Sequence, residues 1–393
     1  MTRAITNESW ISAYLRYTLG QESPELFHKW TAISILASTL KRNVFFDQGF
    51  YVIYPNLYIG IIGPSAKVKK TTAVNIGINL WKDAISDAEL MSKKITPWAI
   101  YERMGILTTK IGSACATIYS PEMKNFISTS YKEDIVTLLT AYYDCPDNED
   151  YETKGGGITP IKNVCLNVIA CSTPEWLVTG ISGSEIGGGY TGRWLFAYRN
   201  KSDRNSPCPE DVVTPEWEEL KLKLAIDLFN ISTIQGQFKF TSSAKMFWKS
   251  WYRTREKEWK DERLFGYYGR KPATILKLSM IIAISEPTFN RFEVTIKHLQ
   301  AAFSLLSELE QDMGNAFSGV TFSESTKMLD RVFRQIINEF SKTGQKVKFS
   351  KLARMNQHFV NSPELETILD SLTKMDNIEY GTDNKGKRVY WPI

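Results

Sequence analysis

The chain has 393 residues, more than one compact core usually supports, which predicts two or three domains. Hydrophobic residues make up 43% of it and aromatic residues 12%, so we expect an ordinary soluble globular protein. The formal net charge of +5 is too small to indicate a polyanionic partner by itself.

The five cysteines include no C-x-x-C pair, and the chain has only three histidines. These counts predict reduced thiols and argue against a structural zinc site. The N-terminus lacks the apolar core of a signal peptide, and no apolar run reaches the roughly 18 residues that a membrane span needs. We therefore expect a cytoplasmic protein that makes no membrane contact.

Spaced apolar residues over 8–40, interrupted by GQESPE, predict two helices, with Pro24 near the start of the second. Short apolar runs then alternate with helical patterns as far as RWLFAYR. Such alternation is typical of a mainly parallel sheet flanked by helices. The predicted fold class is α/β.

Changes of composition predict the domain boundaries. The proline-containing stretch SDRNSPCPEDVVTPE leads into helical patterns, and the polar passage GNAFSGVTFSEST precedes a helix, a strand, two helices and a two-stranded wing, the order of a winged helix. The predicted parts are an N-terminal helical segment at 1–41, an α/β core at 42–202, a helical lid at 203–312, a linker at 313–325 and a winged-helix domain at 326–393.

The stretch GPSAKVKKTTA follows the strand-like run LYIGII and is close to the phosphate-binding pattern G-x-x-x-x-G-K-[ST]. Counting from Gly63 puts the lysine at Lys69, whereas Lys70 followed by Thr71 forms a complete pair in a loop one residue longer. We favour Lys70 with Thr71, and a lysine-rich solvated turn is the alternative. The predicted ATP-binding residues are Gly63, Pro64, Ser65, Ala66, Lys67, Val68, Lys69, Lys70, Thr71 and Thr72, with Thr71 as a ligand of Mg²⁺.

A candidate catalytic glutamate follows the next apolar strand, which ends in IYSPE. Glu122 stands where a Walker B glutamate would orient and polarise the water that attacks a γ-phosphate. Pro121 replaces the usual preceding aspartate, so Mg²⁺ would rest on Thr71, the phosphates and water. The alternative role for Glu122 is that of a carboxylate in the first turn of a helix.

Small polar residues end the third strand, CLNVIACSTPEWL. Ser172 and Thr173 suit a sensor position beside the attacking water. The S-T-P-E sequence is also a good helix N-cap, and both roles are compatible.

A hairpin is expected between the acid and the sensor strand, where Tyr151 and Lys154 precede three glycines. Its tip would present an aromatic ring and a cation to a nucleic-acid backbone. A glycine-rich solvent loop is the alternative.

Two arginines stand where a γ-phosphate would need positive charge. Arg193 follows flexible glycines at a strand start, and Arg270 precedes an apolar helix. One would act across a subunit boundary and the other from the helical lid. Ordinary surface arginines are the alternative.

The order of these motifs resembles the AAA+ helicase-like ATPases of phages and mobile elements, in the clade with a hairpin before sensor 1, related to superfamily 3 and MCM-type helicases. The stretches that carry the resemblance are SPELFHKWTAISILASTLKRNVFF, YPNLYIGIIGPSAKVKKTTA, IYSPEMKNFI, LTAYYDCPDNEDYETKGGG, CLNVIACSTPEWL, GGGYTGRWLFAYRN and YYGRKPATILKLSM. The C-terminal winged helix also resembles that of the family.

The resemblance implies an AAA+ P-loop core and an ATP-fuelled ring, usually a hexamer, that moves along or separates DNA during replication. It implies Walker A roles for Lys70 and Thr71, Walker B for Glu122 and sensor 1 for Thr173 or Ser172. It further implies that Arg193 is a finger acting in trans, Arg270 is sensor 2 and Lys154 is the pore-loop contact to DNA. In the C-terminal unit, Lys385, Lys387 and Arg388 of the wing are the predicted DNA contacts, because SPELETILDSLTK is acidic for a recognition helix.

Two other functions remain open at this point. The ATPase would serve as a switch, such as a helicase loader or replication regulator, or the chain would be a non-catalytic winged-helix DNA-binding protein. A primase is a possible partner of the helicase, since no primase-like carboxylate cluster occurs in this sequence.

Overall fold

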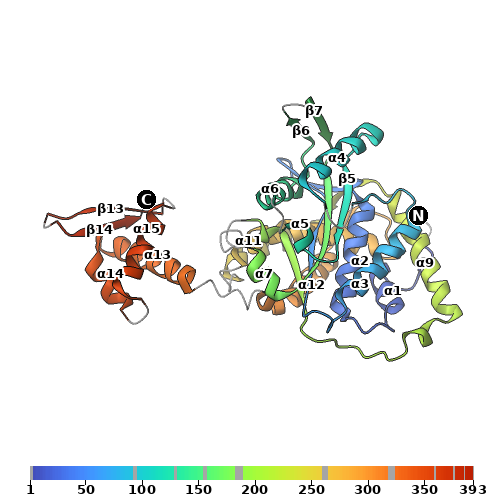
Figure 1. Cartoon of the computed structure of the whole chain (residues 1–393). Coiled ribbons are helices and arrows are strands. Elements are labelled where there is room, and N and C mark those ends of the chain that lie inside the picture. Colours follow the sequence, from blue (N-terminus) through green and yellow to red (C-terminus); the bar gives the residue numbers. More distant parts are fainter. Residues whose placement is uncertain are drawn as a thin grey trace. The chain divides into compact units, whose positions relative to one another are not determined.

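The computed structural model describes residues 3–91, 95–127, 131–153, 157–181, 189–258, 264–316, 324–357, 360–374, 377–384 and 386–392 (Figure 1). The chain divides into two compact units, Met1–Gly319 and Val320–Ile393. Among the described residues, no helix combines the length and apolar character needed to span a bilayer.

A parallel five-stranded sheet forms the centre of the first unit, with strand order β4-β5-β8-β3-β9. Every residue of β3, β5 and β8 is buried, as expected for strands covered on both faces. The mainly parallel α/β sheet predicted from the sequence is thus confirmed. Its strands are β3 (Tyr58–Ile62), β4 (Leu90–Met91), β5 (Cys115–Ser120), β8 (Cys165–Ser172) and β9 (Trp194–Tyr198).

Four helices pack together beside this sheet (Figure 1). The indole of Trp10 donates a hydrogen bond to the Leu224 carbonyl, and Asp227 accepts from the backbone N–H of Ala4, so the N-terminal segment is bound to a helix of the predicted lid. The four are α1 (Trp10–Tyr17), α2 (Glu25–Leu40), α3 (Lys70–Ala84) and α9 (Pro215–Ser232).

The region 203–312, predicted to be helical, also contains strands. Both β10 (Gly236–Phe240) and β11 (Glu293–Val294) belong to a second sheet with β1 (Val44–Asp47) and β2 (Val52–Ile53), in the order β11-β10-β1-β2. The alternation in GQFKF places Phe238 in the core, and this period of two outweighs the helical patterns around it. The helical prediction was wrong for these residues.

Among the other helices of the first unit, α12 packs against β9, and α11, most of whose residues are buried, packs against α12 and η1. Helix α4 lies beside the hairpin of β6 and β7 (Figure 1). Their bounds are α4 (Pro97–Ile111), α5 (Lys124–Ile127), α6 (Lys132–Tyr143), β6 (Asn148–Thr153), β7 (Gly157–Lys162), α7 (Pro174–Gly180), η1 (Thr191–Arg193), η2 (Pro209–Val212), α10 (Ser242–Thr254), η3 (Arg255–Glu258), α11 (Phe265–Ser285) and α12 (Ile296–Ala316).

Helix α12 continues into the segment predicted as a linker. Met313 and Ala316 are buried on its apolar face, which extends the helix four residues into 313–325. The prediction was wrong at this end. Residues 317–323 lie outside the described part, and α13 begins at Glu324.

The second unit has the predicted order of a helix, a short strand, two helices and two strands. Val332, Ile336, Leu352 and Leu369 are buried in its core. Its elements are α13 (Glu324–Thr343), β12 (Val347–Lys348), α14 (Phe349–Asn356), α15 (Ser362–Lys374), β13 (Ile378–Thr382) and β14 (Arg388–Pro392), with the sheet order β12-β14-β13.

Candidate nucleotide site

The loop between β3 and α3 turns sharply without the usual second glycine. Ala66 and Lys69 adopt left-handed backbone conformations, with φ of 60° and 43°. A Cβ at Gly63 would lie 2.5 Å from the Arg199 carbonyl oxygen and 2.7 Å from a methyl group of Val68. Val68 is itself fully buried. The valine therefore anchors the loop, and a left-handed residue immediately before Lys70 makes the turn that glycine would make.

The two candidate lysines point to different partners. The Lys70 ammonium donates hydrogen bonds to the carbonyl oxygens of Gly63, at 2.6 Å, and Pro64, at 3.1 Å. It is thereby folded over the loop. Lys69 instead forms an ion pair with Glu22, and half of its side chain is exposed.

Electrostatics also distinguish Lys70. Partial burial lowers the pKa of its ammonium group, and the negative potential of Cys171, Glu175 and Glu122 opposes that effect. A partly desolvated ammonium group held only by carbonyl dipoles is suited to exchange them for an anion, because a full negative charge binds it more strongly.

A cavity of about 470 Å³ lies against the loop, where β3, β5 and β8 end. Ile62 pairs with Ser172 and Ser120 with Ala170, so the carboxyl ends of these parallel strands meet at one edge of the sheet. We call this cavity the nucleotide cavity. Its lining residues are Ser65, Ala66, Lys69, Lys70, Thr71, Thr72, Pro121, Glu122, Met123, Lys124, Cys171, Ser172, Thr173 and Trp176.

Glu122 lines this cavity beside the loop, as its place in the motif order predicts. Its carboxylate pairs with the Lys124 ammonium at 2.9 Å, and both side chains are half exposed. The turn that carries Glu122 is held by two hydrogen bonds: the Ser120 hydroxyl donates to the Glu122 carbonyl, and the Met123 N–H donates to the Cys171 carbonyl. The backbone is fixed while the carboxylate remains accessible.

Thr173 takes the helix-capping role that its sequence allowed, and its sensor role stays a prediction. Its hydroxyl caps α7 by accepting from the Trp176 N–H at 3.3 Å, and the residue lines the cavity. Ser172 lines the cavity too, and its hydroxyl donates to the Thr173 carbonyl at 3.3 Å. Nine of the predicted residues thus meet in one place: six residues of the loop, Glu122, and the two sensor candidates Ser172 and Thr173.

The sequence patterns missed Met123 and three further cavity residues that carry polar or aromatic groups. Lys124 holds Glu122, Trp176 lies in the first turn of α7, and Cys171 sits beside Thr71. Burial raises the pKa of Cys171 to about 12, while Lys70 and Thr71 act in the opposite direction. The position of Cys171 directly before Ser172 at the strand end was the available signal.

The predicted arginines lie elsewhere, close to each other. A Cβ at Gly189 would meet a guanidinium nitrogen of Arg193 and one of Arg270, each at 3.5 Å. Arg193 also donates to Asp144 at 3.2 Å. Burial, and then the charge of Arg193, lowers the pKa of Arg270. Among the described residues that line the nucleotide cavity, neither arginine occurs.

The two arginines lie near the amino ends of the parallel strands, opposite the carboxyl ends that border the nucleotide cavity. Trp194, which follows Arg193, pairs with the first residue of β3, whereas Gly63 follows the last. Arg193 and Gly63 are six residue steps apart along the strand direction, which corresponds to roughly 20 Å. Neither arginine is placed to reach a nucleotide in the cavity of its own chain.

The predicted DNA contacts are spread over both units. Tyr151 lies in β6 and stacks on Tyr101, and Lys387 and Arg388 are exposed in the second unit, where Arg388 donates to Glu366 at 3.4 Å. Lys154 and Lys385 lie outside the described residues. Contact with DNA stays a prediction for all five.

The residues around Thr71 fit a metal ion that is bound mainly by phosphate. Among the described residues, no cluster of three or more His, Cys, Asp or Glu side chains is arranged to hold a metal. The hydroxyl of Thr71, next to Lys70, is the kind of protein ligand that such an ion would need.

Comparisons with known proteins assign the chain to no family. No protein-family model matches the chain, and no curated protein matches it either.

Proposed function

We propose that the chain is an ATPase whose catalytic site is the nucleotide cavity. The observation that carries this proposal is the meeting of Lys70, Thr71, Glu122 and Thr173 at the carboxyl edge of a parallel sheet. This is the edge where ligands bind in open α/β folds, and the first turn of α3 supplies N–H groups to a phosphate. The proposed fold is an AAA+ P-loop core, with a winged helix as the second unit.

Each residue then has a defined role. Lys70 exchanges the carbonyl oxygens of Gly63 and Pro64 for phosphate oxygens, and its charge opposes the negative charge that develops there. Thr71 would hold Mg²⁺ together with the phosphates, and the ion would supply further charge neutralisation when bound. Thr173 holds the attacking water in line by a hydrogen bond.

Glu122 acts as the general base or orienting group for that water. To do so its carboxylate must turn from Lys124, which is a small cost because the ion pair is half exposed. Lys124 is then left beside the cavity as a second positive charge.

The location of Arg193 and Arg270 favours a ring of identical chains. Since these arginines lie roughly 20 Å from their own loop, they would serve the cavity of a neighbouring chain. A closed cyclic assembly gives every cavity such a neighbour, and we propose a hexamer.

In this assembly the motor acts on DNA. Lys154 at the hairpin tip and the wing of the second unit are the proposed contacts with the phosphate backbone. The chain would then be an ATP-dependent DNA helicase or translocase of a phage or mobile-element replication system, with a primase as a possible partner.

The test combines three measurements on the full chain. Hydrolysis of Mg-ATP is measured with and without single-stranded DNA, unwinding is measured on a forked duplex, and particle size is measured with a nonhydrolysable nucleotide. The proposal predicts DNA-stimulated hydrolysis, strand separation and a hexameric particle. Hydrolysis that leaves the fork intact would favour the switch, and undetectable hydrolysis would favour the non-catalytic DNA-binding protein.

A further inference from the structure

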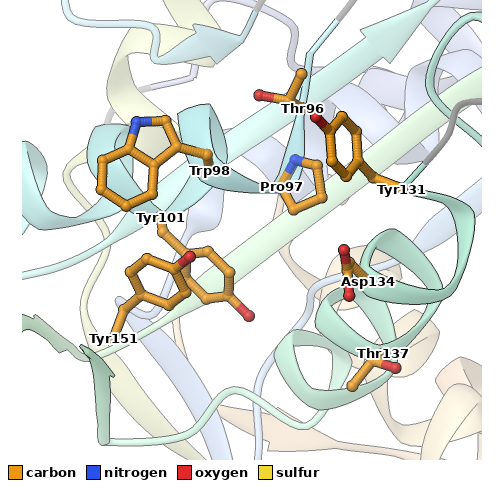
Figure 2. A pocket seen from close by; sticks show the side chains of 8 residues that line it. All are labelled: Thr96, Pro97, Trp98, Tyr101, Tyr131, Asp134, Thr137 and Tyr151. Carbon is orange, nitrogen blue, oxygen red and sulfur yellow. The ribbon is translucent and has the colours of Figure 1, made fainter. Parts of the chain in front are cut away.

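A second cavity, of about 550 Å³, is lined mainly by aromatic side chains (Figure 2). It lies between α4, α6 and β6, and it shares no lining residue with the nucleotide cavity. We call it the aromatic cleft. Its lining residues are Thr96, Pro97, Trp98, Tyr101, Tyr131, Asp134, Thr137 and Tyr151.

One wall of the cleft is a packed set of rings. Thr96 caps α4 and Pro97 opens it, which places Trp98 in the first turn and Tyr101 in the next. The rings of Tyr101 and Tyr151 stack with centroids 3.9 Å apart and planes at 12°. Trp98 meets Tyr151 edge-on at 5.5 Å. These contacts fix the ring positions before any ligand binds.

The other wall is polar. Tyr131 precedes α6, and Asp134 and Thr137 lie one turn apart on that helix. Figure 2 shows Trp98 and Tyr131 on opposite sides of the open space, with Asp134 and Thr137 along one side of it. Trp98 is 49% exposed and Tyr131 is 52% exposed, so both rings can take a ligand.

The charge of the cleft selects the ligand. Among the described residues that line the cleft, Asp134 is the one that carries a charge. Burial raises the pKa of the Tyr101 hydroxyl, and the nearby charges of Glu149 and Asp134 raise it further. Aromatic faces and carboxylates both attract cations, and the carboxylates repel phosphate. The described groups therefore favour an organic cation over an anionic ligand.

The shape of the cleft favours a guanidinium group over an ammonium group. A guanidinium is planar, stacks on aromatic rings and donates to a carboxylate in a fixed fork, whereas an ammonium is a strongly hydrated point charge. The cleft is also much larger than this group alone, so it has room for an aliphatic stem along Pro97 and Trp98.

We propose that the aromatic cleft binds an arginine side chain carried by a basic segment of a partner protein. The guanidinium plane stacks on Trp98 or Tyr131 and donates hydrogen bonds to Asp134. This proposal uses none of the residues assigned to ATP hydrolysis. Arginine binding and ATP hydrolysis can therefore be tested independently.

The test measures binding of a fluorescein-labelled peptide, GSRGSRGSRGS, to the full chain by anisotropy. The matched probes carry citrulline, which keeps the shape of arginine without its charge, or lysine. The arginine peptide is expected to bind about tenfold more tightly than the citrulline peptide, with the lysine peptide between them.

Variants of exposed residues locate the effect. Trp98→Ala and Asp134→Asn should each remove most of the preference for arginine over citrulline. The controls are Phe50→Ala, which changes a fully exposed ring outside the cleft, and Asp150→Asn, which changes an exposed carboxylate on the same hairpin. Both controls should keep the preference, and circular dichroism verifies that each variant is folded.

Three results would overturn the proposal. The first is equal binding of the arginine and citrulline peptides, and the second is an unchanged preference for arginine in Trp98→Ala. The third is a Trp98→Ala variant that loses affinity for a single-stranded oligonucleotide while it keeps its affinity for the arginine peptide. The last would assign the cleft to a nucleobase. Hydrolysis of ATP by the unmodified chain, measured separately, tests the ATPase proposal by itself.

Discussion

At the scale of single residues, two adjacent lysines of the loop have different partners, and these partners bear on which of the two would bind phosphate. The sequence allowed Lys69 or Lys70 as the phosphate-binding residue, and spacing from Gly63 favoured the former. The hydrogen bonds of Lys70 and the left-handed conformation of Lys69 favour the latter. Spacing alone could not distinguish the two lysines. The loop is one residue longer than the usual pattern, and the sequence does not show that Val68 is buried within it.

Lys69→Gly is expected to stabilise the protein. Its φ of 43° is strained for lysine and not for glycine. After the larger conformational entropy loss of glycine, the free energy of unfolding should rise by about 0.5–1 kcal/mol. Urea unfolding measures it. Lys67→Gly, in the same loop without a positive φ, is the control and should lower stability. A lower stability of Lys69→Gly than of this control would contradict the argument.

Gly63→Ala is expected to destabilise the loop. The new methyl group would overlap the Arg199 carbonyl and Val68, and such overpacking costs about 1–3 kcal/mol. In contrast, Gly269→Ala in α11 meets nothing within 4 Å and should raise the free energy of unfolding by up to about 1 kcal/mol. Thermal unfolding compares the two, and equal melting temperatures would refute the clash.

At the scale of elements, the spacing of apolar residues predicted the helices and strands in which that spacing is regular. The helices over 8–40, the strands around the loop and the order of elements in the second unit are confirmed. The strand β10 was missed because it pairs with β1, nearly two hundred residues earlier, and local patterns carry no sign of such a partner. The hairpin was expected, whereas the aromatic cleft at its base depends on α4, for which no element was predicted.

Helix α2 gives a prediction about acid stability. His28 is fully buried, and neither ring nitrogen has a hydrogen-bond partner among the described residues. Burial lowers its pKa to about 3, with a smaller effect from Arg204. The folded protein keeps the ring neutral while the unfolded chain binds a proton below pH 6.5, so stability falls as the pH drops.

The expected loss between pH 7 and pH 5 is about 2 kcal/mol from this residue. Urea unfolding of the wild-type chain and of His28→Leu over this range measures it. The variant should lack this part of the pH dependence. Parallel pH profiles for the two proteins would show that His28 is not the cause.

At the scale of the whole molecule, the arrangement of arginines is the feature that sequence could not give. Arg193 and Arg270 lie 77 positions apart in the chain, and only the packing of α11 against η1 brings them together. The sequence predicted their types and order, but not the edge of the sheet on which they lie. That edge is what favours action on a neighbouring chain.

Mixed assemblies test this arrangement. Arg193→Ala and Lys70→Ala should each be inactive, but equal mixing should restore hydrolysis, because about a quarter of the interfaces then combine an intact cavity with an intact arginine. Asp144→Asn removes the ion pair of Arg193 but keeps its positive charge, so this variant should keep activity. It thereby distinguishes a need for the charge of Arg193 from a need for its ion pair. Failure of the mixture to recover would argue against action between chains.

The central claim is that the nucleotide cavity hydrolyses ATP with Lys70 as the phosphate-binding lysine. The most direct test is the rate of Mg-ATP hydrolysis by the wild-type chain, Lys70→Ala and Lys69→Ala under the same conditions. Hydrolysis should be abolished in Lys70→Ala and retained in Lys69→Ala, whose side chain pairs with Glu22. Loss of hydrolysis in Lys69→Ala with retention in Lys70→Ala, or no hydrolysis by the wild-type chain, would contradict the claim.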